Sequence, residues 1–355
     1  MVNGTAIILT GGWLPENHAK TAHGLLRKSE RFSIKGVVDP VYAGKSTGEI
    51  LKNDFFDVPV YKSIDETLQK LREKPQFCII GVAVHGGKLP DSFRREIEIA
   101  LQNNLSVVSG LHTYLSEDPH FKKLAAWNDC QLIDVRKPRP VCDLRFWTGE
   151  IYSVPAPRIA MLGMDCVIGK RTTARILMEM LRSNGIKTEL IYTGQTGWMQ
   201  GLKYGFIFDA TVNDFIGGEI ERAVLECYRA EKPDLILIEG QSSLRNPSGP
   251  CGSEFILSGD CKGVILQHAP GRIFFDGMEK LKYRIPDVED ELKLIEHYGA
   301  RPIAITLNEQ GMDEVGLEKY RLRLEKSTRL PVLRPLKNQL SGLLPAIHTF
   351  IENRK

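Results

Sequence analysis

The chain has 355 residues, which is more than one hydrophobic core usually serves, so two domains of ordinary size are expected. Hydrophobic residues make up 42% and charged residues 26%, as in folded globular domains, and the formal charge of +3 is too small to indicate a nucleic-acid surface. The seven scattered cysteines contain no CxxC pair, so they fit neither a disulfide framework nor a zinc site and indicate a reducing, cytoplasmic compartment. We read no signal peptide and no apolar run of the roughly 18 residues that span a bilayer, so no membrane partner is expected.

Short runs of β-branched residues alternate with amphipathic stretches of helical length in the first part of the chain. This pattern is typical of a parallel sheet covered by helices. The expected strands are residues 5–9, 34–38, 77–82, 106–108 and 132–135. The expected helices between them are residues 18–29, 64–73, 92–103 and 120–128. Residues 1–140 are therefore predicted to form a Rossmann-like domain.

The first expected strand is followed by a glycine pair that differs from the dinucleotide-binding pattern. Residues 10–13 lack the G-x-G-x-x-G spacing that a pyrophosphate needs in such a fold. Asp39 does end the second expected strand, at the position of a ribose-binding acid. Because the glycine spacing is missing, NAD binding is not favoured.

A proline-rich stretch with little periodicity separates the two halves of the chain. Proline continues neither a helix interior nor a central strand, so we place a connecting segment at residues 141–157. A second α/β series then covers residues 158–355. Its expected strands are residues 159–162, 188–192, 235–238, 263–267 and 302–307. The predicted fold class is α/β with two domains, of which the second is a doubly wound sheet of the P-loop NTPase type.

The turn between the strand at 159–162 and a helix expected at 170–183 has the features of a phosphate-binding loop. Unpaired amides and the dipole of a helix N-terminus favour phosphate. Gly169 lets the backbone approach the phosphate and Lys170 adds a positive charge. A structural turn is the alternative, although a Gly-Lys pair so placed is much less common than a lone glycine pattern. The residues predicted to bind a cofactor here are Gly163, Asp165, Cys166, Gly169, Lys170, Arg171, Thr172 and Thr173.

Two residues depart from the usual G-x-x-x-x-G-K-[ST] pattern. Gly163 lies one residue early, as in the Gly-Thr-Asp loop of dethiobiotin synthetase, which this stretch resembles. Arg171 occupies the position whose hydroxyl ordinarily ligates Mg²⁺, so a metal would be held by Thr172 and Glu239 in a shifted geometry, or would not be used. The loop therefore indicates phosphate binding without indicating ATP hydrolysis.

Two later strands end in residues that suit a ligand site. The strand at 235–238 is followed by Glu239 and Gly240, and resembles the apolar-Glu-Gly segment of dethiobiotin synthetase and its relatives. Ligands of open parallel sheets bind at the carboxyl ends of strands, so Glu239 is predicted to hold a metal or orient an amine, with a helix cap as the alternative. Asn308 follows the last clear strand, where many phosphate-loop proteins read the base, and is a candidate adenine contact.

Other polar residues lie just beyond expected strands. Gln195 and Thr196 are predicted to hydrogen-bond a substrate, and Asp209 or Asp214 to accept a proton, with turn chemistry and helix capping as the alternative. His268 is a candidate general base. Arg272 supplies a guanidinium suited to an anion.

Together these motifs resemble a bacterial and archaeal family, formerly of unknown function, which combines an N-terminal Rossmann-like domain with a C-terminal P-loop domain. The family includes a D-glutamate N-acetyltransferase. The resemblance spans nearly the whole chain and is carried by residues 163–174, 193–198, 214–218 and 238–244. Met164 stands where the usual member has Thr, which removes a hydroxyl but no backbone donor.

The resemblance implies that the loop holds acetyl-CoA by its pyrophosphate, without phosphoryl transfer. Acetyl transfer to an amine then needs a base, for which Asp214, Glu239 and His268 are the candidates. A substrate carboxylate would be bound by Arg245 or Arg272. The implied substrate is a small, carboxylate-bearing amino acid such as D-glutamate, and the oligomeric state is left open.

Two other functions stay open from the residues alone. An ATP-dependent ligase or kinase of the dethiobiotin synthetase type would use Glu239 and an aspartate to bind Mg²⁺ around the triphosphate, although Arg171 weakens this hypothesis. A nucleotide-sensing binding protein, whose two domains close on a ligand without turnover, is the third. The expected cofactor is accordingly acetyl-CoA or ATP, with the use of Mg²⁺ undecided.

Overall fold

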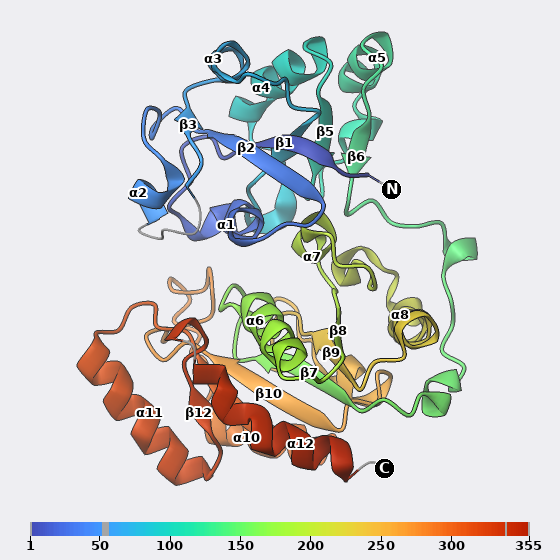
Figure 1. Cartoon of the computed structure of the whole chain (residues 1–355), viewed down its shortest axis with the longest axis vertical. Coiled ribbons are helices and arrows are strands. Elements are labelled where there is room, and N and C mark those ends of the chain that lie inside the picture. Colours follow the sequence, from blue (N-terminus) through green and yellow to red (C-terminus); the bar gives the residue numbers. More distant parts are fainter. Residues whose placement is uncertain (1, 52–56, 338, 354–355) are drawn as a thin grey trace. The chain divides into compact units, whose positions relative to one another are not determined.

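A computed structural model describes residues 2–51, 57–337 and 339–353, and it divides into two compact units (Figure 1). The first unit is Met1–Pro138 together with Gln195–Leu202, and the second is Arg139–Gly194 together with Lys203–Lys355. Within these described residues, each unit contains one six-stranded sheet. The predicted two-domain α/β fold is confirmed.

All strands of the first sheet are parallel and run in the order β3-β2-β1-β4-β5-β6. This is the strand order of the Rossmann fold. The strands are β1 (Gly4–Leu9), β2 (Phe32–Val38), β3 (Val60–Tyr61), β4 (Phe77–Ile80), β5 (Ser106–Ser109) and β6 (Leu132–Asp134). Five of them lie within two residues of the predicted bounds, whereas β3 is too short to give a periodic signal.

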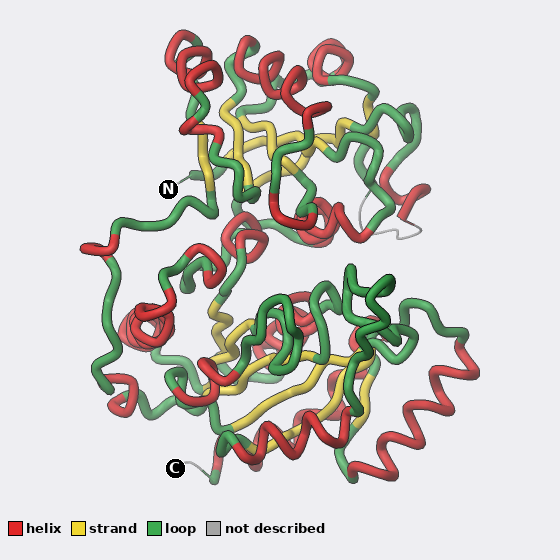
Figure 2. The backbone as a smooth tube through the Cα atoms, turned by 180° about the vertical axis from the view of Figure 1, so that it is seen from behind, coloured by secondary structure: helices red, strands yellow, loops and turns green. Residues whose placement is uncertain are grey.

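Helices cover both faces of the first sheet (Figures 1 and 2). They are α1 (Lys20–Arg27), α2 (Thr47–Leu51), α3 (Ile64–Lys70), α4 (Asp91–Gln102), α5 (Pro119–Trp127) and α7 (Gln195–Gln200). Along β1 the buried side chains alternate, so that Ile7 packs in one core with Phe93 of α4, while Ile8 packs in the other with Leu25 of α1. Both faces are thus apolar, as a buried parallel sheet requires.

Helix α7 corrects the predicted domain division. The sequence placed residues 195–202 in the second domain, but they pack within the first unit. The Gln200 side chain donates through Nε2 to the carbonyl of Gly24 at 2.7 Å. The Arg31 guanidinium lies 4.2 Å from the centre of the Trp198 ring. A segment from the middle of the chain therefore completes the N-terminal unit.

The acid at the end of β2 is fully buried and bonded within its own unit. Asp39 Oδ2 accepts hydrogen bonds from Thr10 Oγ1 at 2.7 Å and from the Leu14 amide at 3.1 Å. Its Oδ1 accepts from the Val41 amide at 3.1 Å. These bonds tie together the turns that follow β1 and β2, which gives this acid a structural role.

The second sheet is also parallel, in the order β12-β11-β10-β7-β9-β8. Its strands are β7 (Arg158–Gly163), β8 (Thr188–Ile191), β9 (Leu235–Glu239), β10 (Gly263–His268), β11 (Arg301–Leu307) and β12 (Val332–Leu333). β7 is central, between β9 and β10, and the strand order reverses there. Ligands of doubly wound sheets bind at the carboxyl ends of the strands at such a point.

The helices of the second unit are α6 (Lys170–Ser183), α8 (Ile216–Glu231), α9 (Ser253–Leu257), α10 (Val288–His297), α11 (Glu314–Thr328) and α12 (Leu344–Glu352). α6 packs against β7, β8 and β9. Residues of α8, α10 and α11 share a core with inward-facing residues of the sheet, among them Leu162, Ile238 and Leu266. Within the described ranges, no helix is long and apolar enough to cross a membrane.

The proline-rich connecting segment is held against α8. Glu221 is buried on that helix and accepts through Oε2 from the amide and the hydroxyl of Thr148, each at 2.8 Å. Its Oε1 accepts from the Ile151 amide at 3.1 Å. Gly218 gives the segment room, because a Cβ there would come within 1.9 Å of the Arg145 carbonyl oxygen. Gly218, near the start of α8, thus has a packing function.

Candidate functional site

The turn between β7 and α6 forms a loop at the carboxyl edge of the second sheet. Gly169 is the N-cap of α6 with φ of 99°, and it has no side chain to accept from the first amides of the helix. Val167 has φ of 53°, a left-handed conformation that is strained for a β-branched residue. Open amides at a helix start favour an anion, so the loop has the geometry of a phosphate site.

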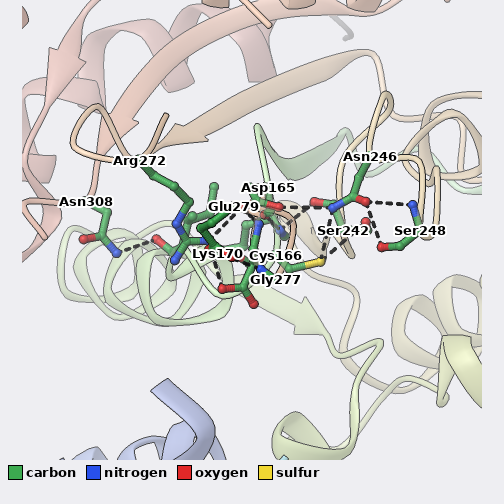
Figure 3. A network of polar contacts seen from close by, with 12 residues as sticks. Asp165, Cys166, Lys170, Ser242, Asn246, Ser248, Arg272, Gly277, Glu279 and Asn308 are labelled. Atoms are coloured by element: carbon green, nitrogen blue, oxygen red, sulfur yellow. Dashed lines mark hydrogen bonds and ion pairs between the residues drawn. The ribbon is translucent and has the colours of Figure 1, made fainter. Parts of the chain in front are cut away.

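Lys170 is buried at the centre of this loop (Figure 3). Its Nζ donates to the carbonyl oxygens of Asp165 at 2.7 Å and Ser242 at 2.8 Å. Burial lowers the pKa of the Lys170 ammonium, and nearby acidic groups, including Cys166 and Asp165, oppose this effect. The ammonium is therefore fixed between the loop and the segment after β9.

Asp165 fastens the loop to two other segments (Figure 3). Its fully buried carboxylate accepts through Oδ1 from Asn246 Nδ2 at 3.1 Å. Oδ2 accepts from Arg272 Nη1 at 2.7 Å and from the Asp276 amide at 2.9 Å. Arg272 Nη1 also donates to the Cys166 carbonyl at 2.7 Å. In this conformation Asp165 binds the protein itself, and its predicted contact with a cofactor stays a prediction.

Arg171 extends from the first turn of α6 to the end of β9. Its Nη1 lies 3.4 Å from Glu239 Oε1. The other oxygen of Glu239 accepts from the Thr193 amide at 3.3 Å, and the Thr193 hydroxyl donates to the Glu239 carbonyl at 2.8 Å. Burial raises the pKa of Glu239, while the Arg171 guanidinium acts in the opposite direction.

The other side of the loop is supported by β10 and β11. Asn308 Nδ2 donates to the Ile168 carbonyl at 2.9 Å, and its Oδ1 accepts from the Gln310 amide at 2.8 Å. Thr173 Oγ1 donates to Gln267 Oε1 at 2.8 Å. Thr172, the candidate metal ligand, is half-buried in the first turn of α6. Asn308 therefore supports the loop, and its contact with an adenine stays a prediction.

The three candidate bases have different environments. Glu239 lies beside the loop, as described. His268 ends β10 and is buried, with Nε2 at 3.0 Å from the Tyr320 hydroxyl, and burial lowers its pKa to about 4. Among the described residues, its Nδ1 has no hydrogen-bond partner. Asp214 lies in the short 3₁₀ turn before α8, and its side chain is exposed.

The candidate substrate-binding residues fall into two groups. Gln195 and Thr196 are buried in α7 of the first unit, where Thr196 Oγ1 lies 3.2 Å from Thr21 Oγ1. Arg245 Nε pairs with the buried Glu291 carboxylate at 2.6 Å, on α10. Arg272, bound to Asp165, is the one candidate for carboxylate binding that contacts the loop itself.

Sequence reasoning missed the residues that brace the loop from the segment after β9. Ser242 supplies the carbonyl for Lys170 and has φ of 38°. Asn246 binds Asp165 and also accepts through Oδ1 from Ser248 Oγ at 2.8 Å. The sequence Asn-Pro-Ser-Gly from Asn246 predicts a turn here, but it does not predict which residues the turn contacts.

Family models match both units of the chain. The P-loop domain described as "Domain of unknown function (DUF1611_C)" matches residues 145–344, and the Rossmann-like domain described as "Domain of unknown function (DUF1611_N)" matches residues 40–138. The chain belongs to the DUF1611 family. The family resemblance predicted from the loop motifs is thereby confirmed.

Relatives of this DUF1611 chain include proteins with a named activity. A D-glutamate N-acetyltransferase of Tritonibacter scottomollicae is 28% identical over 276 residues, which cover 76% of this chain and 80% of the relative. Another, from a Pseudoalteromonas species, is 26% identical over 273 residues, covering 75% and 79%. The crystal structure of a DUF1611 family protein from Anabaena variabilis superposes with a TM-score of 0.88 at 29% identity, covering 98% of this chain and all of the other.

Proposed function

We propose that this DUF1611 protein is an N-acetyltransferase that uses acetyl-CoA to acetylate the amino group of an amino acid such as D-glutamate. The two relatives named for this reaction support the proposal at 28% and 26% identity. The structural observation that carries it is the loop, where Lys170 and the open start of α6 favour a phosphate while Arg171 replaces the hydroxyl that phosphoryl-transfer enzymes use for magnesium.

The residues of the loop fit the pyrophosphate of a CoA ligand. Gly169 leaves the first amides of α6 without a side-chain acceptor, and Lys170 holds a positive charge beside them. When bound, acetyl-CoA supplies an activated acetyl thioester. The loop only has to bind and orient the phosphates. Oriented backbone amides can do this without taking part in bond making or breaking.

Glu239 is the base that we assign to the substrate ammonium. It lies at the carboxyl end of β9, in contact with the first turn of α6, and burial raises its pKa above that of an exposed glutamate, which makes it a stronger base. Arg171 and the Thr193 amide fix the two carboxylate oxygens. His268 is the weaker base because its pKa is about 4.

Arg272 is the residue that we assign to the substrate carboxylate. In the part of the chain that the structure describes, its hydrogen bonds all use Nη1, so Nη2 and Nε stay available for a second anion. Arg245 instead uses both Nε and Nη2 in contacts with Glu291 and the Asp287 carbonyl. Arg272 also contacts the phosphate loop, through the Asp165 carboxylate and the Cys166 carbonyl.

The test is an assay of thiol release from acetyl-CoA with D-glutamate as acceptor, L-glutamate as the stereochemical control, and product identified by mass. We expect amino-acid-dependent release by the parent. Lys170→Ala should lower the rate at subsaturating acetyl-CoA by about one to two orders of magnitude, because it removes a charge-assisted contact with phosphate. Lys293→Ala is the matched control, since Lys293 pairs with Asp290 on the surface of α10.

Retained activity in Lys170→Ala, with its fold checked by thermal unfolding, would remove the loop from the mechanism. Absence of acetylated product from any amino acid, together with tight binding of Mg-ATP, would overturn the acetyltransferase proposal. An ATP-dependent ligase or kinase, or a nucleotide sensor, would then take its place.

A further inference from the structure

The first turn of α6 departs from the phosphate-loop fold at the residue that follows the lysine. In P-loop NTPases that residue is Ser or Thr, and its hydroxyl binds the Mg²⁺ of the nucleotide together with an acid on a neighbouring strand. Here the acid is present as Glu239 at the end of β9, next to β7. The hydroxyl is replaced by the side chain of Arg171.

The Arg171 guanidinium is directed at that acid. Nη1 lies 3.4 Å from Glu239 Oε1, and the Glu239 side chain is only 4% exposed. The second oxygen of Glu239 accepts from the Thr193 amide. Both oxygens of the carboxylate are therefore engaged, one by a cation and one by a backbone donor.

A divalent metal does not fit this arrangement. To bind Glu239 it would have to displace Arg171 or lie within a few ångströms of a permanent positive charge. A buried carboxylate needs a cationic partner, and in this chain the partner is an arginine.

We propose that Arg171 takes the place of magnesium, so that the loop binds a pyrophosphate ligand without a divalent metal. This deepens the proposed function and rests on it only in requiring that the loop bind phosphates. Arginine carries five donors in a planar fork, so Nη1 can keep its contact with Glu239 while other nitrogens donate to phosphate oxygens.

The charge balance indicates which phosphate ligand suits the loop. Lys170 contributes one positive charge, and the charge of Arg171 is largely offset by Glu239. The start of α6 adds the partial positive charge of a helix N-terminus. This suits the diester pyrophosphate of CoA, which has one negative charge on each phosphate, better than the more highly charged triphosphate of ATP, which normally brings its own magnesium.

The test is calorimetric titration of the full-length protein with CoA and, separately, with ADP, each in EDTA and in excess MgCl₂. We expect at least one of the two to bind in EDTA, and magnesium to tighten that binding by less than about fivefold. A gain of about fivefold or more with magnesium, or no binding of either probe in EDTA, would overturn the proposal. Because no acetyl transfer is measured, a failed acetyltransferase assay leaves this test intact.

Three variants give the role of Arg171 a signature. Arg171→Ser should weaken binding in EDTA by about tenfold or more and make it respond to magnesium, because it restores the hydroxyl of ordinary phosphate loops. Arg171→Lys should weaken binding in EDTA less than Arg171→Ser does, because lysine keeps the positive charge although it lacks the planar set of five donors. Glu239→Gln should tighten binding of the probe in EDTA, because it removes a negative charge. If Glu239 were instead a magnesium ligand, the same change would weaken binding of the probe.

Arg182→Ser is the matched control, because Arg182 forms an Arg-Glu pair with Glu189 near the other end of α6. It should bind the probes as the parent does. Thermal unfolding checks that each variant is folded. Unchanged binding in folded Arg171→Ser, or weaker binding in folded Glu239→Gln, would show that Arg171 does not replace the metal.

Discussion

The side chain of Lys170 lies across Gly163, the last residue of β7. A Cβ added to Gly163 would come within 3.0 Å of Lys170 Cδ and 2.9 Å of Ile168 Cδ1. The early glycine of the loop is therefore needed for space, since it lets the lysine cross the end of the strand and reach the carbonyls that hold it. Gly163 and Lys170, the first glycine and the lysine of the motif, therefore depend on each other for packing.

Gly163→Ala should displace the lysine while leaving the fold intact. The atoms that the new methyl group meets belong to flexible side chains, so we expect a small loss in free energy of unfolding but roughly tenfold weaker binding of CoA. Calorimetry and thermal unfolding measure the two effects. Gly169→Ala is the comparison, because its φ of 99° strains an alanine although the nearest atom is 3.8 Å away. Unchanged affinity in Gly163→Ala would mean that the lysine does not need this space.

Asp165→Ala should loosen the loop. It removes the acceptor of three hydrogen bonds and leaves Arg272 without its closest anionic partner. We expect a loss of about 3 kcal/mol in the free energy of unfolding by urea. Asp290→Ala, which breaks only an exposed pair with Lys293, should cost less than about 0.5 kcal/mol. Similar losses in the two variants would contradict a bracing role for Asp165.

His268 should make stability depend on pH. Its folded pKa of about 4 lies below the ordinary 6.5, so the unfolded chain takes up the proton first. The contribution of neutral His268 to the free energy of unfolding is therefore fully present above about pH 6.5, and it is lost as the pH falls towards 4. Between pH 7.5 and pH 5, the free energy of unfolding should fall by about 2 kcal/mol more in the parent than in His268→Gln. Urea unfolding at both pH values measures this difference.

Tyr320→Phe is the control for that experiment. It removes the hydroxyl near His268 Nε2 but keeps the ring that helps to bury the imidazole, so the pH dependence should persist. An equal loss on acidification in the parent and His268→Gln would show that burial does not suppress protonation at this position.

Gly218→Ala should destabilise the protein although alanine favours helices. In an open helix interior the change would add up to about 1 kcal/mol of stability. Here the new methyl group would meet the Arg145 carbonyl oxygen at 1.9 Å, so the connecting segment has to move. We expect the midpoint of thermal unfolding to fall by several degrees. Gly185→Ala has nothing within 4 Å but a φ of 80°, and isolates backbone strain alone.

Local patterns in the sequence were sufficient for much of the fold and for the position of the loop. The buried strands are apolar runs of nearly correct length, and α6 begins at Lys170 and ends at Ser183 as predicted, because the glycine before it and the Asn-Gly after it are local signals. The same holds for Glu239, which a strand-end rule places at the sheet edge.

What the sequence could not show are contacts between distant segments. The sequence marks Arg171 as an unusual residue at a metal-binding position, but its pairing with Glu239 depends on the sheet order that brings β9 beside β7. Asp39 has the position of a ribose ligand and instead bonds to Thr10 and Leu14. Which unit receives α7 depends on partners such as Gly24 that lie far away in the chain.

The path of α7 also affects how the protein is made. Residues 1–138 emerge from the ribosome well before the segment 195–202 that belongs to their unit. Met199 of that segment is fully buried with Ala22 and Leu25, so those side chains are left uncovered until translation has passed residue 202. The N-terminal unit therefore cannot complete its fold until the segment 195–202 has been synthesised. Part of the second unit has been synthesised by then, so the folding of the two units overlaps in time.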